Sequence, residues 1–301
     1  MKILLTGRNG QLGWELARTL APLGVLTAYD RTTLNLAKPD QIAAAVHSVK
    51  PDIIVNAAAY TAVDRAESEP DAAFAVNAIA PGLLAEGAKR IGALLIHYST
   101  DYVFDGAKET PYVEKDWPNP LNVYGRSKLA GEQAIGDVGG QYLILRTSWI
   151  YAARGRNFLL TILRLLKEKD ELRVVSDQIG APTFAGALAN ATAKLLQQFN
   201  PTALGNARGI YHVTALGHTS WYGFAAEIAR LERTRREIRI VPIPSDEYPL
   251  PARRPKNSRL SSEKLLRRFG VALPSWQASL KACHDELREG KRLDAGAQHA
   301  R

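Results

Sequence analysis

The chain has 301 residues, 46% of them hydrophobic and 23% charged, which is an ordinary composition for a globular protein with a large core. Its single cysteine, Cys283, excludes an intrachain disulfide framework and favours a reducing compartment. Because no apolar run reaches the length of a signal-peptide core or a membrane span, we expect a cytoplasmic protein with no membrane partner.

The formal net charge of +9 raises the question of nucleic-acid binding. Basic clusters lie in the C-terminal third, at 233–239, 253–256 and 267–268, and they form no aromatic-interleaved patch and match no nucleic-acid-binding motif. We therefore expect solvated helix faces first, a positive field for a small anionic ligand second, and no nucleic-acid partner.

The N-terminus predicts a strand, a glycine turn and a helix in direct succession. Residues 2–6 form an apolar run, Gly7, Gly10 and Gly13 follow, and a helical pattern extends through Leu20. In this context the glycines are typical of a dinucleotide-binding turn, where they allow a tight turn, a close approach of pyrophosphate and close helix–strand packing. The alternative is a turn that needs glycines for steric reasons alone.

The next strand, at 25–29, ends at Asp30, where a dinucleotide-binding fold places the acid that binds the adenosine ribose. Asp30 favours a free 2′-hydroxyl, whereas the adjacent Arg31 favours a 2′-phosphate. The choice between NADH and NADPH therefore stays open.

Strands and helices alternate through the first half of the chain. We expect helices at 40–50 and 70–90, the second kinked at Pro81, and strands at 53–55, 94–98 and 142–145. This order predicts an α/β fold with a doubly wound, Rossmann-like parallel sheet, in which ligands bind beyond the carboxyl ends of the strands. One composite site is expected there, because polar or small residues follow each strand end: the glycine turn, Asp30, 56–59, 99–101 and Trp149.

Beyond Tyr151 the alternation loosens, which predicts a smaller C-terminal α/β cap that binds substrate. Expected elements are helices at 157–169, 184–199, 221–232, 261–269 and 276–288, and strands at 172–175 and 209–213. We assign 1–151 to the dinucleotide-binding domain, with 183–213 returning to it. Residues 152–182 and 214–301 form the cap, with a polar, frayed tail from about 290.

Tyr124 and Lys128 are four residues apart, so on a helix both side chains share one face. A neighbouring ammonium stabilises a phenolate, and we expect Lys128 to lower the pKa of Tyr124 towards neutrality, as acid–base catalysis on a carbonyl requires. The alternative is an ordinary pair on a solvated helix. Five histidines show no metal-ligand spacing and are expected to be structural: His47, His97, His212, His218 and His284.

These patterns together resemble the extended short-chain dehydrogenase/reductases, and among them the dTDP-4-dehydrorhamnose reductase family, from Lys2 to about Leu287. The motifs that carry the resemblance are the glycine turn and the segments 56–64, 99–106, 120–128, 146–149, 177–183 and 254–258. The glycine turn and the Tyr/Lys pair are shared by the whole superfamily, whereas the 99–106 run and the Trp149 segment are more specific to the reductases.

The resemblance implies a cofactor site for NADPH or NADH. Its implied residues are Gly7, Gly10, Gln11, Leu12 and Gly13 at the pyrophosphate, Asp30 and Arg31 at the ribose, Asn35 and Leu36 at the adenine, and Ala59, Tyr60, Thr61 and Tyr98 along the flank. Asn35 stands where the family usually has an acidic residue, so the charge at the adenine is lost.

The resemblance also implies the reacting residues. Tyr124 would donate the proton, Lys128 would bind the nicotinamide ribose, and Thr100 would offer its hydroxyl to the carbonyl oxygen. The implied substrate-binding residues are Thr100, Asp101, Tyr102, Tyr124, Trp149 and Arg254. Two of these have structural alternatives, since Thr100 could cap a strand and Trp149 could belong to the core of the cap.

The activity so implied is NADPH- or NADH-dependent reduction of the 4-keto group of dTDP-4-dehydro-L-rhamnose, with a dTDP-sugar as partner and a homodimer left open. A 4,6-dehydratase would need a second acid where this chain has Tyr102. An epimerase and a non-catalytic regulatory subunit remain alternatives. Glu286 and Glu289 are candidate counterparts of a magnesium site in some relatives, but the full set does not match, so Mg²⁺ is left open and no metal ligands are assigned.

Overall fold

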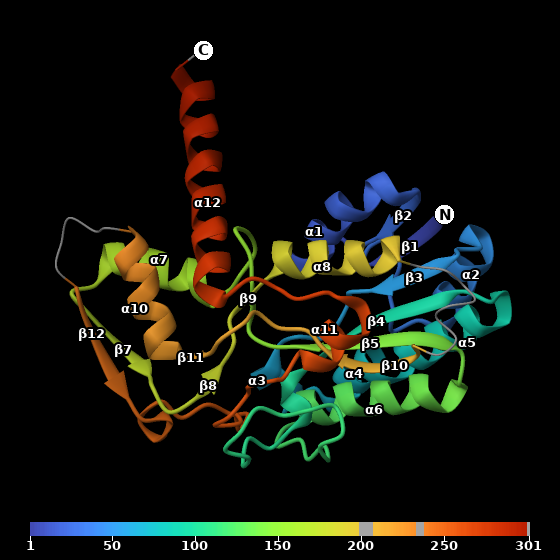
Figure 1. The fold of residues 1–301 in the computed structure, drawn as a ribbon, viewed down its shortest axis with the longest axis horizontal. Coiled ribbons are helices and arrows are strands. Elements are labelled where there is room, and N and C mark those ends of the chain that lie inside the picture. Colours follow the sequence, from blue (N-terminus) through green and yellow to red (C-terminus); the bar gives the residue numbers. More distant parts are fainter. Residues whose placement is uncertain (199–206, 233–237, 300–301) are drawn as a thin grey trace.

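The structure, a computed structural model, describes residues 1–198, 207–232 and 238–299, with side chains described through residue 289 (Figure 1). Most of the first basic cluster predicted from the sequence, residues 233–237, therefore lies outside the described residues. In the part of the chain that is described, no helix is both long and apolar enough to cross a membrane.

A six-stranded sheet forms the centre of the molecule, with strand order β10-β5-β4-β3-β1-β2. Every neighbouring pair is parallel, which confirms the predicted doubly wound α/β sheet. Its strands are β1 (Lys2–Thr6), β2 (Val25–Tyr29), β3 (Ile53–Asn56), β4 (Leu94–Thr100), β5 (Gln141–Thr147) and β10 (Gly209–His212).

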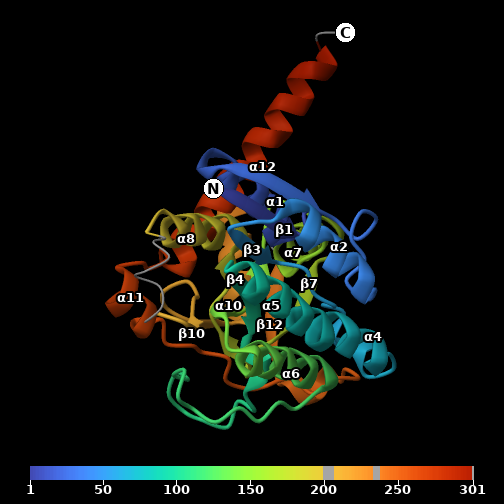
Figure 2. The ribbon, with the colours of Figure 1, turned by 90° about the vertical axis from the view of Figure 1, so that its right-hand side faces the viewer.

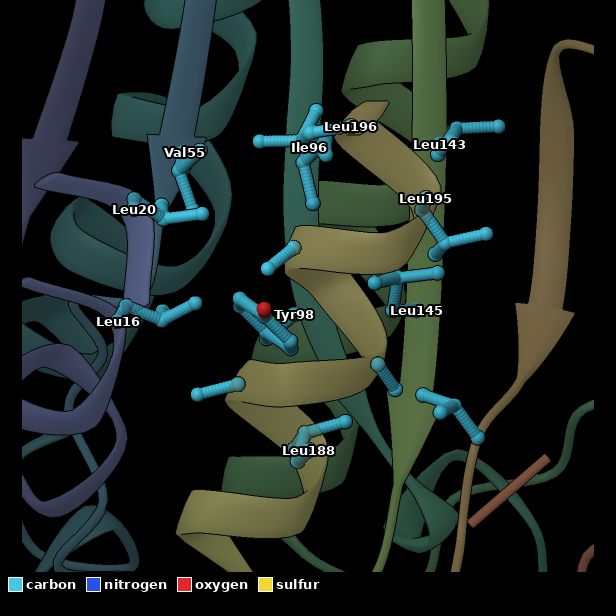
Figure 3. Close-up of a cluster of buried hydrophobic side chains, with 14 of the residues drawn as sticks. Leu16, Leu20, Val55, Ile96, Tyr98, Leu143, Leu145, Leu188, Leu195 and Leu196 are labelled. Carbon is cyan, nitrogen blue, oxygen red and sulfur yellow. The ribbon is translucent and has the colours of Figure 1, made fainter. Parts of the chain in front are cut away.

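Helices cover both faces of the sheet. On one face lie α1 (Gln11–Leu20) and α8 (Ala185–Gln197), and on the other α2 (Pro39–Val49), α5 (Ala80–Ile91) and α6 (Val123–Val138) (Figure 1). Strand residues alternate between the two cores: Ile3 and Leu5 belong to the α1/α8 side, Leu4 to the other. Figure 3 shows α8 lying over β4 and β5, with Leu188, Leu195 and Leu196 against the sheet.

The predicted helix at 70–90 is present as an uninterrupted helical run, but it contains a π-helical turn. After α3 (Val63–Ala66) come α4 (Pro70–Phe74), a π-helical turn at Ala75–Ile79, and α5, in which Pro81 is near the first position. The irregular turn therefore precedes Pro81 instead of lying at it. The reason is that Pro81 has no N–H to bond the carbonyl of Asn77, so the hydrogen-bond pattern widens one turn earlier.

A second group of elements packs around its own core, centred on Phe224, Leu159 and Trp276. It contains α7 (Phe158–Glu168), α10 (Trp221–Glu232), the parallel pair β7 (Glu171–Val175) and β12 (Arg239–Ile243), and the start of α12 (Trp276–His299). Short pairs join β6 (Ile150–Tyr151) to β9 (Thr183–Phe184) and β8 (Ile179–Gly180) to β11 (Thr219–Ser220), and α11 (Glu263–Phe269) packs near β10. The domain boundaries stay a prediction.

The C-terminal helix is longer than predicted. α12 continues to His299, whereas the sequence predicted an end at 288 and a frayed tail from about 290. Gly290 and Gly296 are weak helix formers, but the Lys, Arg, Leu and Ala residues around them favour the helix, and no proline interrupts it. Figure 2 shows the end of α12 projecting away from the rest of the molecule.

A buried ion pair ties α6 to two strands. Arg146 on β5 donates from Nε and Nη2 to the Glu132 carboxylate on α6, at 2.9 and 2.5 Å, and Ser99 on β4 donates to the same carboxylate at 2.5 Å. Both charged side chains are only 2% exposed. Loss of either partner would leave an uncompensated charge in the core.

We expect Glu132→Ala to lower the free energy of unfolding by about 3–5 kcal/mol, measured by urea denaturation, because it leaves the Arg146 guanidinium buried and unpaired. Glu168→Ala is the control, because its pair with Arg164 is exposed and should contribute less than about 1 kcal/mol. Equal losses in the two variants would contradict this account.

Candidate active site

The glycine turn between β1 and α1 is sterically constrained at two of its three glycines. Gly7 has a φ of +76°, and a Cβ there would lie 2.7 Å from the backbone nitrogen of Ala58. A Cβ at Gly13 would lie 1.9 Å from the carbonyl oxygen of Gly7. A Cβ at Gly10 would meet the same oxygen at 3.2 Å, which is tight but tolerable with a small shift. Steric need therefore explains Gly7 and Gly13 better than it explains Gly10.

Gly10 is the exposed N-cap of α1, and no side chain caps the helix there. The first-turn N–H groups of such a helix point outward and carry partial positive charge, which suits a phosphate. The Gln11 side chain already has a partner, since its Oε1 accepts a 2.7 Å hydrogen bond from Asn157. The Leu12 side chain is buried in the core. These two predicted cofactor residues therefore offer their backbone N–H groups.

Asp30 is held at the end of β2 by its own turn. Its carboxylate accepts hydrogen bonds from Thr32 and Thr33, and also from the Asn9 amide of the glycine turn at 2.9 Å. The bonds from Thr32 and Thr33, led by the Thr32 hydroxyl, lower the pKa of Asp30 to about 2. The acid is thus ionised and tied to the glycine turn, with the exposed Arg31 beside it.

The side chains of three other predicted cofactor residues make contacts within the protein. Asn35 accepts a hydrogen bond from the N–H of Ala37 in its own loop, and Leu36 is buried in the core on the α2 side. The Tyr98 side chain is also buried, in the core beneath α8 (Figure 3). Its phenol donates or accepts a 2.6 Å hydrogen bond with Thr192 on α8. Packing therefore occupies the Tyr98 side chain that we predicted to touch the cofactor.

Sequence reasoning missed Asn77, which fixes the loop that contains Ala59, Tyr60 and Thr61. The buried Asn77 amide accepts from the Tyr60 N–H at 2.8 Å and donates to the Tyr60 carbonyl and to the Ser127 hydroxyl, both at 3.0 Å. Ser127 lies on α6, next to Lys128. A polar residue inside an otherwise apolar helical stretch was the available signal for this contact.

The start of α6 places Tyr124 beside the end of β4. Asn122 caps the helix by accepting from the Gly125 N–H at 2.8 Å. The 3₁₀ turn that follows β4, Asp101–Val103, packs closely against Gly125. A Cβ at Gly125 would lie 2.2 Å from the Tyr102 carbonyl oxygen, so only glycine allows this contact. As a result the Tyr102 and Tyr124 rings meet edge to face, 5.7 Å apart.

Thr100 lies between Tyr124 and Asp101. Its hydroxyl donates to Asp101 Oδ1 at 3.0 Å and accepts from the Tyr102 N–H at 3.2 Å, so it does cap the 3₁₀ turn. Hydrogen bonding with Thr100 also lowers the pKa of Tyr124, which places this hydroxyl at the phenol. Asp101 is 3% exposed, and burial raises its pKa to about 6. The structural alternative and the predicted role of Thr100 are thus compatible.

The pKa of Tyr124 moves opposite to our expectation. Burial raises it to about 12, with Thr100 opposing and the charge of Asp101 adding to the rise. Lys128 donates to the Tyr98 carbonyl at 2.6 Å and lies 3.1 Å from His97 Nε2. The expected lowering by Lys128 is therefore wrong for this structure: burial disfavours the phenolate, and the lysine is directed towards β4. Burial also lowers the pKa of Lys128 to about 8.

A large cleft of about 820 Å³ begins at Tyr102 and extends over the second group of elements. Aromatic and basic side chains line it, among them Phe158, Trp221, Arg253, Arg254 and Lys256. Tyr102, whose ring contacts that of Tyr124, lines this cleft, whereas Tyr124 and the glycine turn do not.

Arg254 is held by a partner of its own. Its guanidinium forms two hydrogen bonds to the Asp64 carboxylate, at 2.9 and 2.8 Å, and a third to the Ala252 carbonyl. Arg254 is therefore positioned in the cleft, but much of its charge is compensated. No role was predicted from the sequence for Asp64, which lies in the 56–64 motif. In the structure Asp64 binds Arg254.

Trp149 is strained and stacked. Its φ is +48°, rare for a residue with a large side chain, and its ring lies 3.6 Å from that of Trp221 at an interplanar angle of 6°. Gly180 leaves room for it, since a Cβ there would lie 2.5 Å from the indole. One face of Trp149 thus packs on α10, as the core alternative supposed, and the predicted sugar contact stays a prediction.

Two expectations concerned histidines and metal. His97, expected to be merely structural, is hydrogen bonded towards Lys128.

Among the described residues, no group of three or more His, Cys, Asp or Glu side chains could hold a metal ion. Glu286 is half-buried, and burial and the nearby Glu15 raise its pKa, with Glu289 contributing less.

Comparison with known proteins shows extensive similarity. The family model of the RmlD substrate binding domain matches residues 1–289. Curated dTDP-4-dehydrorhamnose reductases from Burkholderia thailandensis and Escherichia coli K12 are 51% and 47% identical, covering 95% of this chain and 99% and 98% of their own. A solved dTDP-4-dehydrorhamnose reductase from Bacillus anthracis in complex with NADP has a TM-score of 0.88, 37% identity, and coverage of 95% and 99%.

We expect Gly10→Ala to weaken NADPH and NADH binding at least about tenfold, measured by quenching of protein fluorescence, because its methyl group would obstruct an approach to the first-turn N–H groups of α1. The melting temperature should change little. Gly13→Ala is the matched comparison and should unfold at a distinctly lower temperature, because its methyl group meets the Gly7 carbonyl. Unaltered cofactor affinity in Gly10→Ala would contradict the assignment.

Proposed function

Since the chain belongs to the RmlD substrate binding domain family, we propose that it reduces the 4-keto group of dTDP-4-dehydro-L-rhamnose to give dTDP-L-rhamnose. The observation that carries this proposal is the meeting of Tyr124, Thr100 and Asp101 at the end of β4, next to Tyr102, which lines a large cleft. The reductases named above match this chain along almost their whole length.

A nicotinamide dinucleotide, NADPH or NADH, fits the groups at the ends of β1 and β2. The turn at Gly7–Gly13 keeps side chains away from the N-terminus of α1, and the ionised Asp30 stands at the ribose position with Arg31 next to it. When bound, this cofactor supplies the hydride. The chain's own residues orient it and provide the proton.

Tyr124 is suited to be that proton donor. With its pKa raised to about 12, the phenol keeps its proton at neutral pH and can transfer it to an oxygen that gains negative charge. Thr100, beside the phenol, stabilises the same oxygen through its hydroxyl. To do so, the Thr100 hydroxyl must rotate away from the Asp101 carboxylate. When no substrate carbonyl is present, the hydroxyl donates to that carboxylate instead.

Lys128 acts one helical turn below. Its ammonium offers a donor to the nicotinamide ribose, while its other contacts are to β4. The Lys128 side chain is 2% exposed, so the ammonium acts with little screening by water.

The cleft beyond Tyr102 suits the nucleotide part of a dTDP-sugar. Phe158 and Trp221 offer apolar ring surfaces for a base, and Arg253 and Lys256 bring positive charge for a diphosphate. Arg253 and Lys256 are exposed, and Lys256 has only a long 3.8 Å contact to Asp177, whereas Arg254 is closely paired with Asp64. We therefore assign the diphosphate to the first two, and to Arg254 the positioning of Tyr102, with which it forms a hydrogen bond.

The direct test is to incubate the protein with dTDP-4-dehydro-L-rhamnose and NADPH, then NADH, and follow nicotinamide absorbance. We expect oxidation of at least one cofactor and formation of dTDP-L-rhamnose. We further expect Tyr124→Phe to fold and bind cofactor but to lose turnover by about 10²- to 10⁴-fold, because the general acid is gone. Tyr142→Phe, at the opposite end of the sheet, is the control.

Failure of the wild-type protein to oxidise either cofactor would favour the epimerase or the regulatory subunit. Near-normal reduction by Tyr124→Phe would reject the assignment of the proton donor while leaving the overall reaction intact.

We expect Arg253→Gln and Lys256→Gln each to raise the KM for the dTDP-sugar several-fold, and the double variant by about tenfold or more, because each loses a charge-assisted contact to phosphate. The KM for the cofactor should stay the same. Arg267→Gln is the control, because it removes an exposed charge on α11. Equal increases in both KM values would argue against this assignment.

A further inference from the structure

A chain of buried hydrogen bonds runs behind Lys128, across three neighbouring strands. Thr6 Oγ1 donates to Asn56 Oδ1 at 2.6 Å, Asn56 Nδ2 lies 3.0 Å from His97 Nδ1, and His97 Nε2 lies 3.1 Å from Lys128 Nζ. The sheet register places Thr6 opposite Asn56 and Asn56 opposite His97. All four residues are at most 2% exposed.

The hydrogens in this chain are linked, because a neutral imidazole has one donor nitrogen and one acceptor nitrogen. Burial lowers the pKa of His97 well below its usual value, so the ring is neutral. In the observed arrangement the Asn56 amide donates to Nδ1, so Nε2 carries the hydrogen and faces Lys128 Nζ. A hydrogen on Nε2 requires an acceptor, which Lys128 can be only as a neutral amine.

A second arrangement fits the charged lysine. If the Asn56 amide turns by half a rotation, its oxygen accepts from a hydrogen on His97 Nδ1, and its NH₂ group donates to Thr6 Oγ1. The bare Nε2 then accepts from the Lys128 ammonium. The two arrangements differ by one proton, which passes to solvent when Lys128 is titrated, and neither leaves a buried polar group unpaired between Asn56 and Lys128.

Other groups around Lys128 are already committed. The Tyr98 carbonyl accepts from Nζ in either state, and Glu132, whose charge raises the pKa of Lys128, is paired with Arg146 and Ser99. Tyr124 lies one turn away on the same helix. His97 is thus the partner of Lys128 that can either donate or accept.

We propose that Thr6, Asn56 and His97 form a positioning relay for Lys128, in which the His97 tautomer and the Asn56 amide orientation change with the charge of the lysine. The relay keeps Lys128 in one place in both protonation states and stabilises the ammonium more strongly, because hydrogen bonds to charged groups are the stronger ones. The catalytic meaning of the relay rests on the proposed reductase function, since only there does the ammonium bind the nicotinamide ribose.

The tautomer can be observed without turnover. In protein labelled with ¹⁵N in the histidine rings, with His97 assigned by comparison with His97→Gln, we expect Nε2 to carry the hydrogen at high pH and Nδ1 to carry it at low pH. The change should have its midpoint near pH 8, where the pKa of Lys128 lies. In Lys128→Met the change should disappear. One tautomer throughout the pH range, or the same change in Lys128→Met, would overturn the proposal.

Kinetics give a second, independent measurement. Lys128 is charged below its pKa, so kcat/KM should fall as the pH rises through about 8. In His97→Phe the ammonium loses a buried partner, and the midpoint of this fall should move down by about one pH unit. His97→Gln retains an amide that can donate or accept and should keep the wild-type midpoint. An unmoved midpoint in His97→Phe would overturn the proposal.

His212 offers a matched control. It is also fully buried, and its Nδ1 lies 3.1 Å from the Tyr112 carbonyl. His212→Gln should affect stability without moving the midpoint. The two measurements also separate the proposals: a pH-dependent tautomer without reduction of the sugar would refute the reductase function alone, and reduction with a fixed tautomer would refute the relay alone.

Discussion

The burial of the Lys128 amino group is the constraint on which the centre of the molecule depends. A buried amino group needs hydrogen-bond partners in either charge state, and it finds them on β4, in the Tyr98 carbonyl and His97. Helix α6 must therefore lie close along that strand, and the pair of Glu132 with Arg146 holds it there. Because the helix is fixed in this way, its first turn brings Tyr124 over the end of β4.

The same first turn of α6 joins the sheet to the segment that borders the cleft. Asn122 caps the helix through its oxygen and donates from its amide nitrogen to the Arg253 carbonyl at 2.7 Å. Arg254, the next residue, is bound to Asp64 beyond β3. The segment that brings positive charge to the cleft is thus attached at the residues next to Tyr124, so the cleft and the phenol are positioned by common contacts.

The sequence was most informative where structure depends on local rules. Alternating strands and helices predicted the parallel sheet, and the spacing of Gly7 and Gly13 predicted a turn that other residues would not fit. What it could not supply was the set of contacts between distant segments. The burial that raises the pKa of Tyr124, the core position of the Tyr98 phenol and the bond from Asn157 to Gln11 all depend on how separate elements pack. His97 has no informative spacing to Lys128, and only the sheet register aligns it with Asn56.

The left-handed backbone of Trp149 limits the substitutions that the protein can accept at this position. Such a conformation costs a bulky residue about 1–3 kcal/mol relative to an unstrained one, and glycine would relieve it. Glycine, however, would remove the indole that stacks on Trp221 at the border of the cleft. Relief of the backbone strain and retention of the stacked ring pair therefore favour different residues at this one position, so no single substitution can achieve both.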